Sequence, residues 1–218
     1  SSMPDELKIE LMQTMLKRIT EAVPNVASAA ASFIYQICKN EESRPLLEEC
    51  VAPALAALME RLESVTNLTT ENILMRENIL VAIASIGLNI LKNDFPVEET
   101  METILKALPI VKQTQCNIEV YMFLNSKSSL VAKELQLEYI RIYSWVFAQP
   151  ESQLNQLEIG LLVLCRMGSI LNEFLSSYSP EQQKEIIEEA LDNDEYKLAC
   201  FAEGFESIKN NIQSLGMG

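Results

Sequence analysis

Histidine is absent from the 218-residue chain, and glycine and proline are scarce, with six and eight residues. Without histidine the ordinary Ser-His-Asp and Cys-His catalytic arrangements are excluded. No glycine-rich phosphate loop is present either. Neighbouring carboxylates such as Glu98 and Glu99 diverge by about 100° on a helix and do not share a site. We therefore expect binding rather than catalysis, with no cofactor and no metal.

Basic residues are also few. The chain has 17 lysines and arginines against 31 aspartates and glutamates, which gives a formal net charge of −14. Binding of nucleic acid or of an anionic membrane requires a basic surface, so we expect neither partner. An acidic surface favours a basic protein partner, although many proteins are acidic simply to stay in solution.

The cysteines number five, which is odd, and none forms a CxxC pair. A structural zinc site and a disulfide framework are both poorly supported by this pattern. Each cysteine lies in an apolar helical context, where a free thiol packs like a small hydrophobic side chain. Free thiols indicate a reducing compartment, and we expect the protein in the cytoplasm and nucleus.

Leucine, isoleucine, alanine, glutamate and methionine dominate what is present, and this composition favours helices. Residues 80–91 are apolar on nearly every side, broken only by Ser85, Gly87 and Asn89. A helix of this kind must be covered on more than one side. Its length is well below the roughly 20 residues that cross a bilayer. The sequence thus predicts an all-α fold with a deeply buried helix at its centre.

Helical periodicity, prolines and polar loops predict about ten helices in five antiparallel hairpins. Pro53 falls inside one predicted helix and should kink it. Pro96 suits a first helical turn, and Pro109 should end the same helix. Gly160 and Gly168 share one face of another, where they permit close helix packing. The expected segments are 4–23, 24–39, 44–65, 70–92 with Thr70 as its cap, 96–108, a short helix around 118–122, 130–148, 152–177, 180–191 and 194–215.

A family resemblance rests on four segments. Glu77-Asn78, Ala82-Ile83 and Ile86 resemble the inner helix of late HEAT repeats in the importin-beta (karyopherin-beta) superfamily. Residues 96–110, PVEETMETILKALPI, look like the family's outer helix ending in Leu-Pro, and residues 117–124 are similar to the next inner helix. Ser179-Pro180-Glu181-Gln182-Gln183 resembles a segment near the C-terminus of the importin-five-like branch.

The resemblance implies a HEAT-type α-solenoid that spans residues 1–218 as one domain. It also implies the C-terminal part of a nuclear transport receptor, which binds protein cargo on a curved surface. Ser1-Ser2-Met3 looks like an expression scar before an introduced start, which suits a fragment. In this family Ran-GTP is held mainly by N-terminal repeats, which we expect to lie outside this sequence. The candidate cargo-binding residues lie on inner helices: Glu71, Glu77, Asn78, Asn117, Glu119 and Tyr121.

Alternatives remain at this stage. Asn78 could instead bond a neighbouring repeat and serve the structure alone. The whole chain could be another HEAT-type or armadillo-type scaffold or adaptor. An acidic excess between residues 181 and 206 could attract lysine-rich cargo or form a solvated end of the domain. This stretch has nine acidic residues and only two basic ones, Lys184 and Lys197. The acidic residues are Glu181, Glu185, Glu188, Glu189, Asp192, Asp194, Glu195, Glu203 and Glu206.

Overall fold

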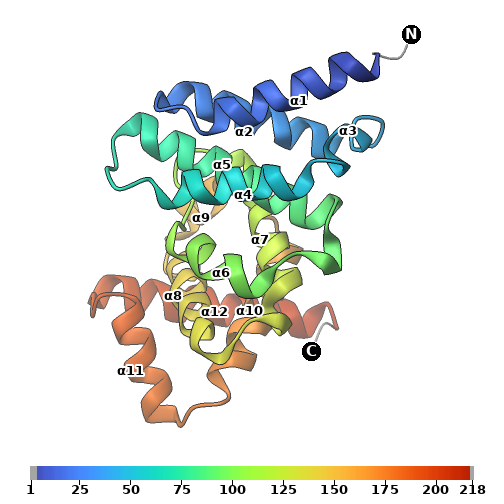
Figure 1. Cartoon of the computed structure of the whole chain (residues 1–218). Helices are drawn as coiled ribbons and strands as arrows, with labels where there is room; N and C mark the ends of the chain where they lie inside the picture. The colour runs from blue at the N-terminus through green and yellow to red at the C-terminus, as the bar shows by residue number, and fades with distance from the viewer. Residues whose placement is uncertain (1–3, 217–218) are drawn as a thin grey trace. The chain divides into compact units, whose positions relative to one another are not determined.

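The computed structural model describes residues 4–216, and the all-α prediction is confirmed (Figure 1). Within this range the chain forms twelve α-helices and three short 3-10 helices, with no strand. The residues interpreted above as an expression scar, Ser1-Ser2-Met3, lie outside the described residues. The chain divides into two compact units, Ser1–Pro96 and Val97–Gly218, which we call the N-terminal and C-terminal units.

The helices of the N-terminal unit pack in two rows. One row contains α1, α3 and α4, and the other contains α2 and α5. Contacts of α1 with α2 and of α4 with α5 join the rows, so the hairpins are antiparallel neighbours. The bounds are α1 Asp5–Ile19, α2 Pro24–Lys39, α3 Pro45–Glu48, α4 Val51–Glu63, α5 Thr70–Asn89 and η1 Lys92–Asp94.

Helix α5 forms the centre of this unit, as its composition predicts. Every residue from 79 to 87 is buried, and Ile83 and Ile86 are completely inaccessible. The most extensive helix–helix contact in the described chain joins α5 to α2, which presents the fully buried Ala27 and Ala31. Small side chains let two helix backbones approach closely, and this explains the tight pairing.

The polar interruptions of α5 have structural partners. Asn89 accepts a hydrogen bond from Arg44 Nη2 at 3.2 Å and donates through Nδ2 to the Ser85 carbonyl at 3.0 Å. Arg44 Nε also donates to the Cys38 carbonyl at 2.7 Å. These bonds hold the loop before α3 against the end of α5, because buried polar groups require partners.

The predicted helix over 44–65 is wrong in one respect, since two helices, α3 and α4, occupy this segment. Pro53 is the third residue of α4, where its missing N–H costs nothing. In a continuous helix its ring would clash with the carbonyl of Glu49, so the chain breaks there instead of kinking. The cap of α5 is also one residue earlier than predicted, because the Thr69 side chain accepts from the Asn72 amide at 3.3 Å.

The C-terminal unit shows the same two-row packing. Helices α6, α8 and α11 follow one another in one row, and α7, α10 and α12 in the other. Helix α8 also contacts α10 and α12, which joins the rows. The bounds are α6 Val97–Lys106, η2 Thr114–Cys116, α7 Asn117–Lys127, η3 Ser128–Leu130, α8 Lys133–Phe147, α9 Glu151–Gln156, α10 Leu161–Leu175, α11 Pro180–Ala190 and α12 Glu195–Ser214.

The proline and glycines of this unit affect its helices in different ways. Helix α6 ends three residues before Pro109, as predicted. The predicted helix 152–177 is wrong, because Glu158 and Gly160 adopt positive φ values of 54° and 84° and separate α9 from α10. Gly160 therefore forms a turn. Of the two glycines expected to permit close packing, only Gly168 does so, since an added Cβ would lie 2.5 Å from Cγ2 of Ile208 on α12.

Replacing Ile83 with aspartate tests the central position of α5. The substitution removes a fully buried side chain and places a carboxylate in an apolar interior, at a cost of about 4 kcal/mol or more. Ordinary domains are stable by about 5–15 kcal/mol, so we expect loss of soluble protein or a large fall in Tm. Leu68→Asp, at a side chain that is 59% exposed, is the control and should unfold normally. A normal thermal transition for Ile83→Asp, followed by circular dichroism, would contradict this packing.

Candidate functional site

The three candidates on α5 lie in different environments. Glu71 is exposed in the first turn, Asn78 is half-buried, and Glu77 is completely buried. A large protein partner contacts accessible side chains, so Glu77 presents no surface to such a partner. Of these residues, Glu71 offers the most accessible charge.

Asn78 makes the contact that its structural alternative predicts. Its Nδ2 donates to the hydroxyl of Ser28 on α2 at 2.7 Å. The bond joins the second helices of two successive hairpins across an otherwise apolar contact. Because the amide is committed to this bond, we assign Asn78 to the packing of α2 on α5.

Two of the three candidates on α7 are interior residues. Asn117 is completely buried and donates through Nδ2 to the Leu157 carbonyl at 3.0 Å, which fixes the start of α7 beside the turn after α9. Tyr121 is also completely buried, and its ring centroid lies 6.3 Å from that of Tyr143. Glu119 is half-buried, so only this candidate on α7 retains accessible surface.

Tyr121 belongs to a buried tyrosine cluster between α7 and α8. The rings of Tyr139 and Tyr143 meet edge to face at 5.6 Å. Tyr143 donates to the Asn125 side chain at 2.8 Å, and Asn125 Nδ2 donates to the Val163 carbonyl at 3.3 Å. Burial raises the pKa of Tyr121 well above its ordinary value, which keeps the phenol neutral. The cluster therefore stabilises the junction of α7, α8 and α10.

The acidic excess of residues 181–206 lies on α11, on α12 and on the turn between them. All nine acids are at least partly exposed. Both bases pair locally, Lys184 with Glu188 at 3.6 Å and Lys197 with Asp192 at 2.8 Å. Asp194 caps α12 by accepting from the amides of Tyr196 and Lys197. The remaining carboxylates form a solvated negative surface, which increases the encounter rate of cationic partners.

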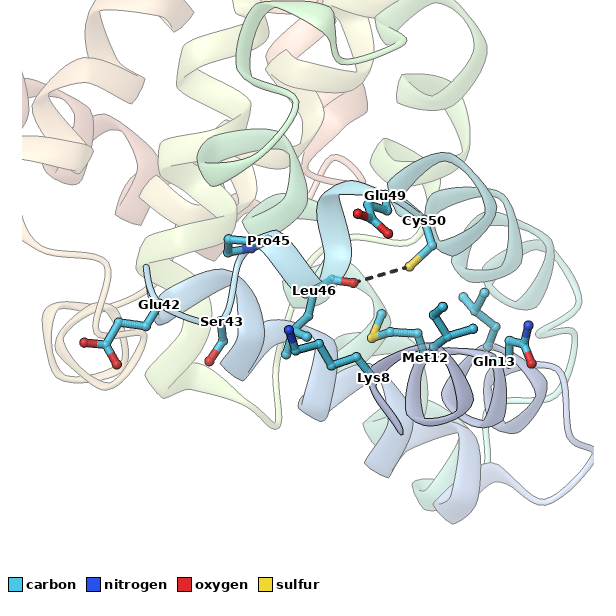
Figure 2. Close-up of a pocket in the computed structure, with 11 residues that line it drawn as sticks. Lys8, Met12, Gln13, Glu42, Ser43, Pro45, Leu46, Glu49 and Cys50 are labelled. Carbon is cyan, nitrogen blue, oxygen red and sulfur yellow. Dashed lines mark hydrogen bonds between the residues drawn. The ribbon is translucent and has the colours of Figure 1, made fainter. Parts of the chain in front are cut away.

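A groove in the N-terminal unit was not predicted from the sequence. Figure 2 shows the residues that line it, which lie on α1 and on the segment that includes α3 and the turns on either side. The groove has a volume of about 770 Å³. One apolar stripe of α1 consists of Leu7, Leu11, Met15 and Ile19. A second stripe, Ile9, Met12 and Leu16, lies at i, i+3 and i+7 on the same helix and lines the groove. Two apolar stripes on one helix were the signal that could have revealed it.

Metal and membrane sites were also sought in residues 4–216. No group of three or more cysteine, aspartate or glutamate side chains in that range is arranged to hold a metal ion. None of the helices described is both long enough and apolar enough to span a bilayer.

The chain matches none of the family models, none of the curated proteins and none of the solved structures with which it was compared. Function is therefore inferred from the residues and their arrangement.

A double-mutant cycle on Asn78 and Ser28 tests the structural role of Asn78. We expect a coupling energy of about 0.5–1.5 kcal/mol between Asn78→Ala and Ser28→Ala, because each single change removes the same hydrogen bond. Urea unfolding of the four proteins measures it. Asn78→Ala combined with Ser207→Ala, an exposed position on α12, is the control and should be additive. Additivity of the Asn78 and Ser28 changes would contradict the assignment.

Proposed function

We propose that this chain is part of an importin-beta-type nuclear transport receptor, built as a HEAT-type solenoid that binds protein cargo without catalysis. The observation that carries the proposal is the two-row packing within each unit. Successive hairpins place their first helices beside one another and their second helices beside one another. This order of contacts is the one that stacked helical repeats make.

The segments with the family resemblance agree with this arrangement. Glu77 to Ile86 lies on α5, in the row formed with α2. PVEETMETILKALPI contains α6, which packs on α8 in the other row of its unit. Helix α7, which carries Asn117 to Leu124, lies in the row of α10 and α12. The placement of these three segments in stacked rows supports the proposal.

Cargo contact is proposed for the accessible candidates alone. Glu71 and Glu119 retain exposed surface on second helices of their hairpins, whereas Glu77, Asn117 and Tyr121 do not. The net charge of −14 favours a lysine-rich cargo. Ran-GTP binding belongs to repeats outside this sequence, and a receptor of this type works in both the cytoplasm and the nucleus.

Binding of a lysine-rich nuclear localisation peptide tests the proposal. We expect weak binding that decreases as salt rises, because exposed charges are screened over about 8 Å at physiological ionic strength. Glu71→Gln with Glu119→Gln should weaken the affinity about fivefold or more. Fluorescence anisotropy of a labelled peptide measures the Kd.

The matched control is Glu98→Gln with Glu99→Gln. Both residues are exposed on α6, which lies in the other row of its unit, and the charge change equals that of the first pair. We expect less than a twofold change for this control. Equal losses of affinity in the two double variants would show that the peptide is attracted to the acidic protein without a specific site. That result would contradict the cargo assignment and favour an unrelated helical-repeat scaffold.

A further inference from the structure

The groove between α1 and α3 has the dimensions of a docking site for one short segment. Its α1 wall runs from Lys8 to Leu16, eight steps of about 1.5 Å or roughly 12 Å of helix. Its opposite wall runs from Glu42, before α3, to Cys50, after α3. The volume of about 770 Å³ leaves room for several large side chains.

The floor of the groove is apolar and partly open to solvent. Ile9 is 53% exposed, Met12 is 5% exposed, and Leu16 and Leu46 are half-buried. Methionine adapts its shape to different partners, and an accessible isoleucine beside it supplies apolar surface that a partner can remove from water. Aromatic residues are absent from the groove lining.

The walls differ in charge. Lys8 and Gln13 lie on α1, whereas Glu42 and Glu49 lie on the α3 wall. In Figure 2 the two glutamates stand near opposite ends of that wall, and Lys8 lies between them on the α1 side. A partner that fits this pattern carries positive charge along one edge only.

The lining decides between the common ways in which proteins bind peptides. Strand addition needs a free sheet edge, and the walls here are a helix on one side and turns with the short α3 on the other. Proline-rich segments need an aromatic-lined groove, and phosphorylated or acidic motifs need a cluster of arginines. The groove offers neither. The mode that its apolar floor does fit is an amphipathic helix, whose anchors repeat at i, i+4 and i+7 over about 10 Å.

We propose that this groove binds an amphipathic α-helix of a partner protein, with apolar anchors on the floor and lysine or arginine along the edge that faces Glu42 and Glu49. The negative charges of Glu42 and Glu49 favour a lysine or arginine of the partner at this edge. The site lies on the row of α1 and α3, so this inference goes beyond the proposed cargo contacts on α5 and α7 and does not depend on them.

A displayed library of random 16-residue peptides is the probe. We expect binders recovered on the whole chain to share apolar residues at i, i+4 and i+7 with basic residues on one flank. The best binder, synthesised with a fluorescent label, should lose affinity at least tenfold on Ile9→Asp, at an exposed position whose substitution leaves the fold intact. Glu42→Lys with Glu49→Lys should cause a comparable loss.

Two controls separate the groove from general attraction to an acidic protein. Glu98→Lys with Glu99→Lys changes the charge equally and should alter the Kd less than twofold. Cys50 lies in the groove and Cys200 lies on α12, and both are half-buried. Bound peptide should slow iodoacetamide modification of Cys50 at least fivefold, measured by mass spectrometry, and leave Cys200 unchanged.

The proposal is overturned if no recovered peptide protects Cys50, or if the two charge-reversal pairs weaken binding equally. Recovery of extended, proline-rich or acidic sequences that protect Cys50 would also overturn it, because the occupant would not be a basic helix. Protection of Cys50 by raising the chain concentration alone, without peptide, would identify a second copy of the chain as the occupant instead.

Discussion

A helix that is apolar on every side must be covered from several directions, and this constraint organises the N-terminal unit. In the N-terminal unit α5 is such a helix, and α2 and α4 cover it. In the C-terminal unit α10 is buried on one face only, against α7, α8 and α12, and leaves Leu162, Arg166 and Glu173 exposed on the other. Burial of each large aliphatic side chain supplies about 1.5–3 kcal/mol toward this packing.

The same constraint decides where function can lie. Asn78 and Asn89 on α5 are half-buried and Asn117 on α7 is buried, and each bonds a neighbouring segment. An interior bond stabilises the fold and removes the residue from any partner surface. Accessible side chains include Glu71 at the start of α5, the solvated acids of α11 and α12, and Ile9 in the groove beside α1.

Apolar periodicity and the prolines were enough to predict three features. These are the helical content, the burial of residues 79–87 at the centre of their unit, and the end of α6 before Pro109. The break at Pro53 was not, because the sequence does not say whether a proline falls in the first turn of a helix or in its middle. Gly160 was misjudged because spacing to Gly168 suggested packing, whereas its positive φ makes it a turn. Glu77, Asn117 and Tyr121 were expected to face cargo as polar residues of inner helices. All three are buried, because polarity indicates exposure only on average. The second apolar stripe of α1 indicated a further face to be covered, but the width of the groove depends on how far α3 stands from α1, which no local pattern encodes.

Amide hydrogen exchange tests the organising constraint most directly. If α5 is the covered centre of its unit, amides 79–87 should exchange more slowly than any other part of residues 4–96, and at least tenfold more slowly than those of α1, which is free to open locally at the edge. Mass spectrometry of quenched peptic fragments resolves both segments. Exchange of residues 79–87 at the rate of α1 would contradict the account, because it would show that α5 is not the helix on which the packing of this unit depends.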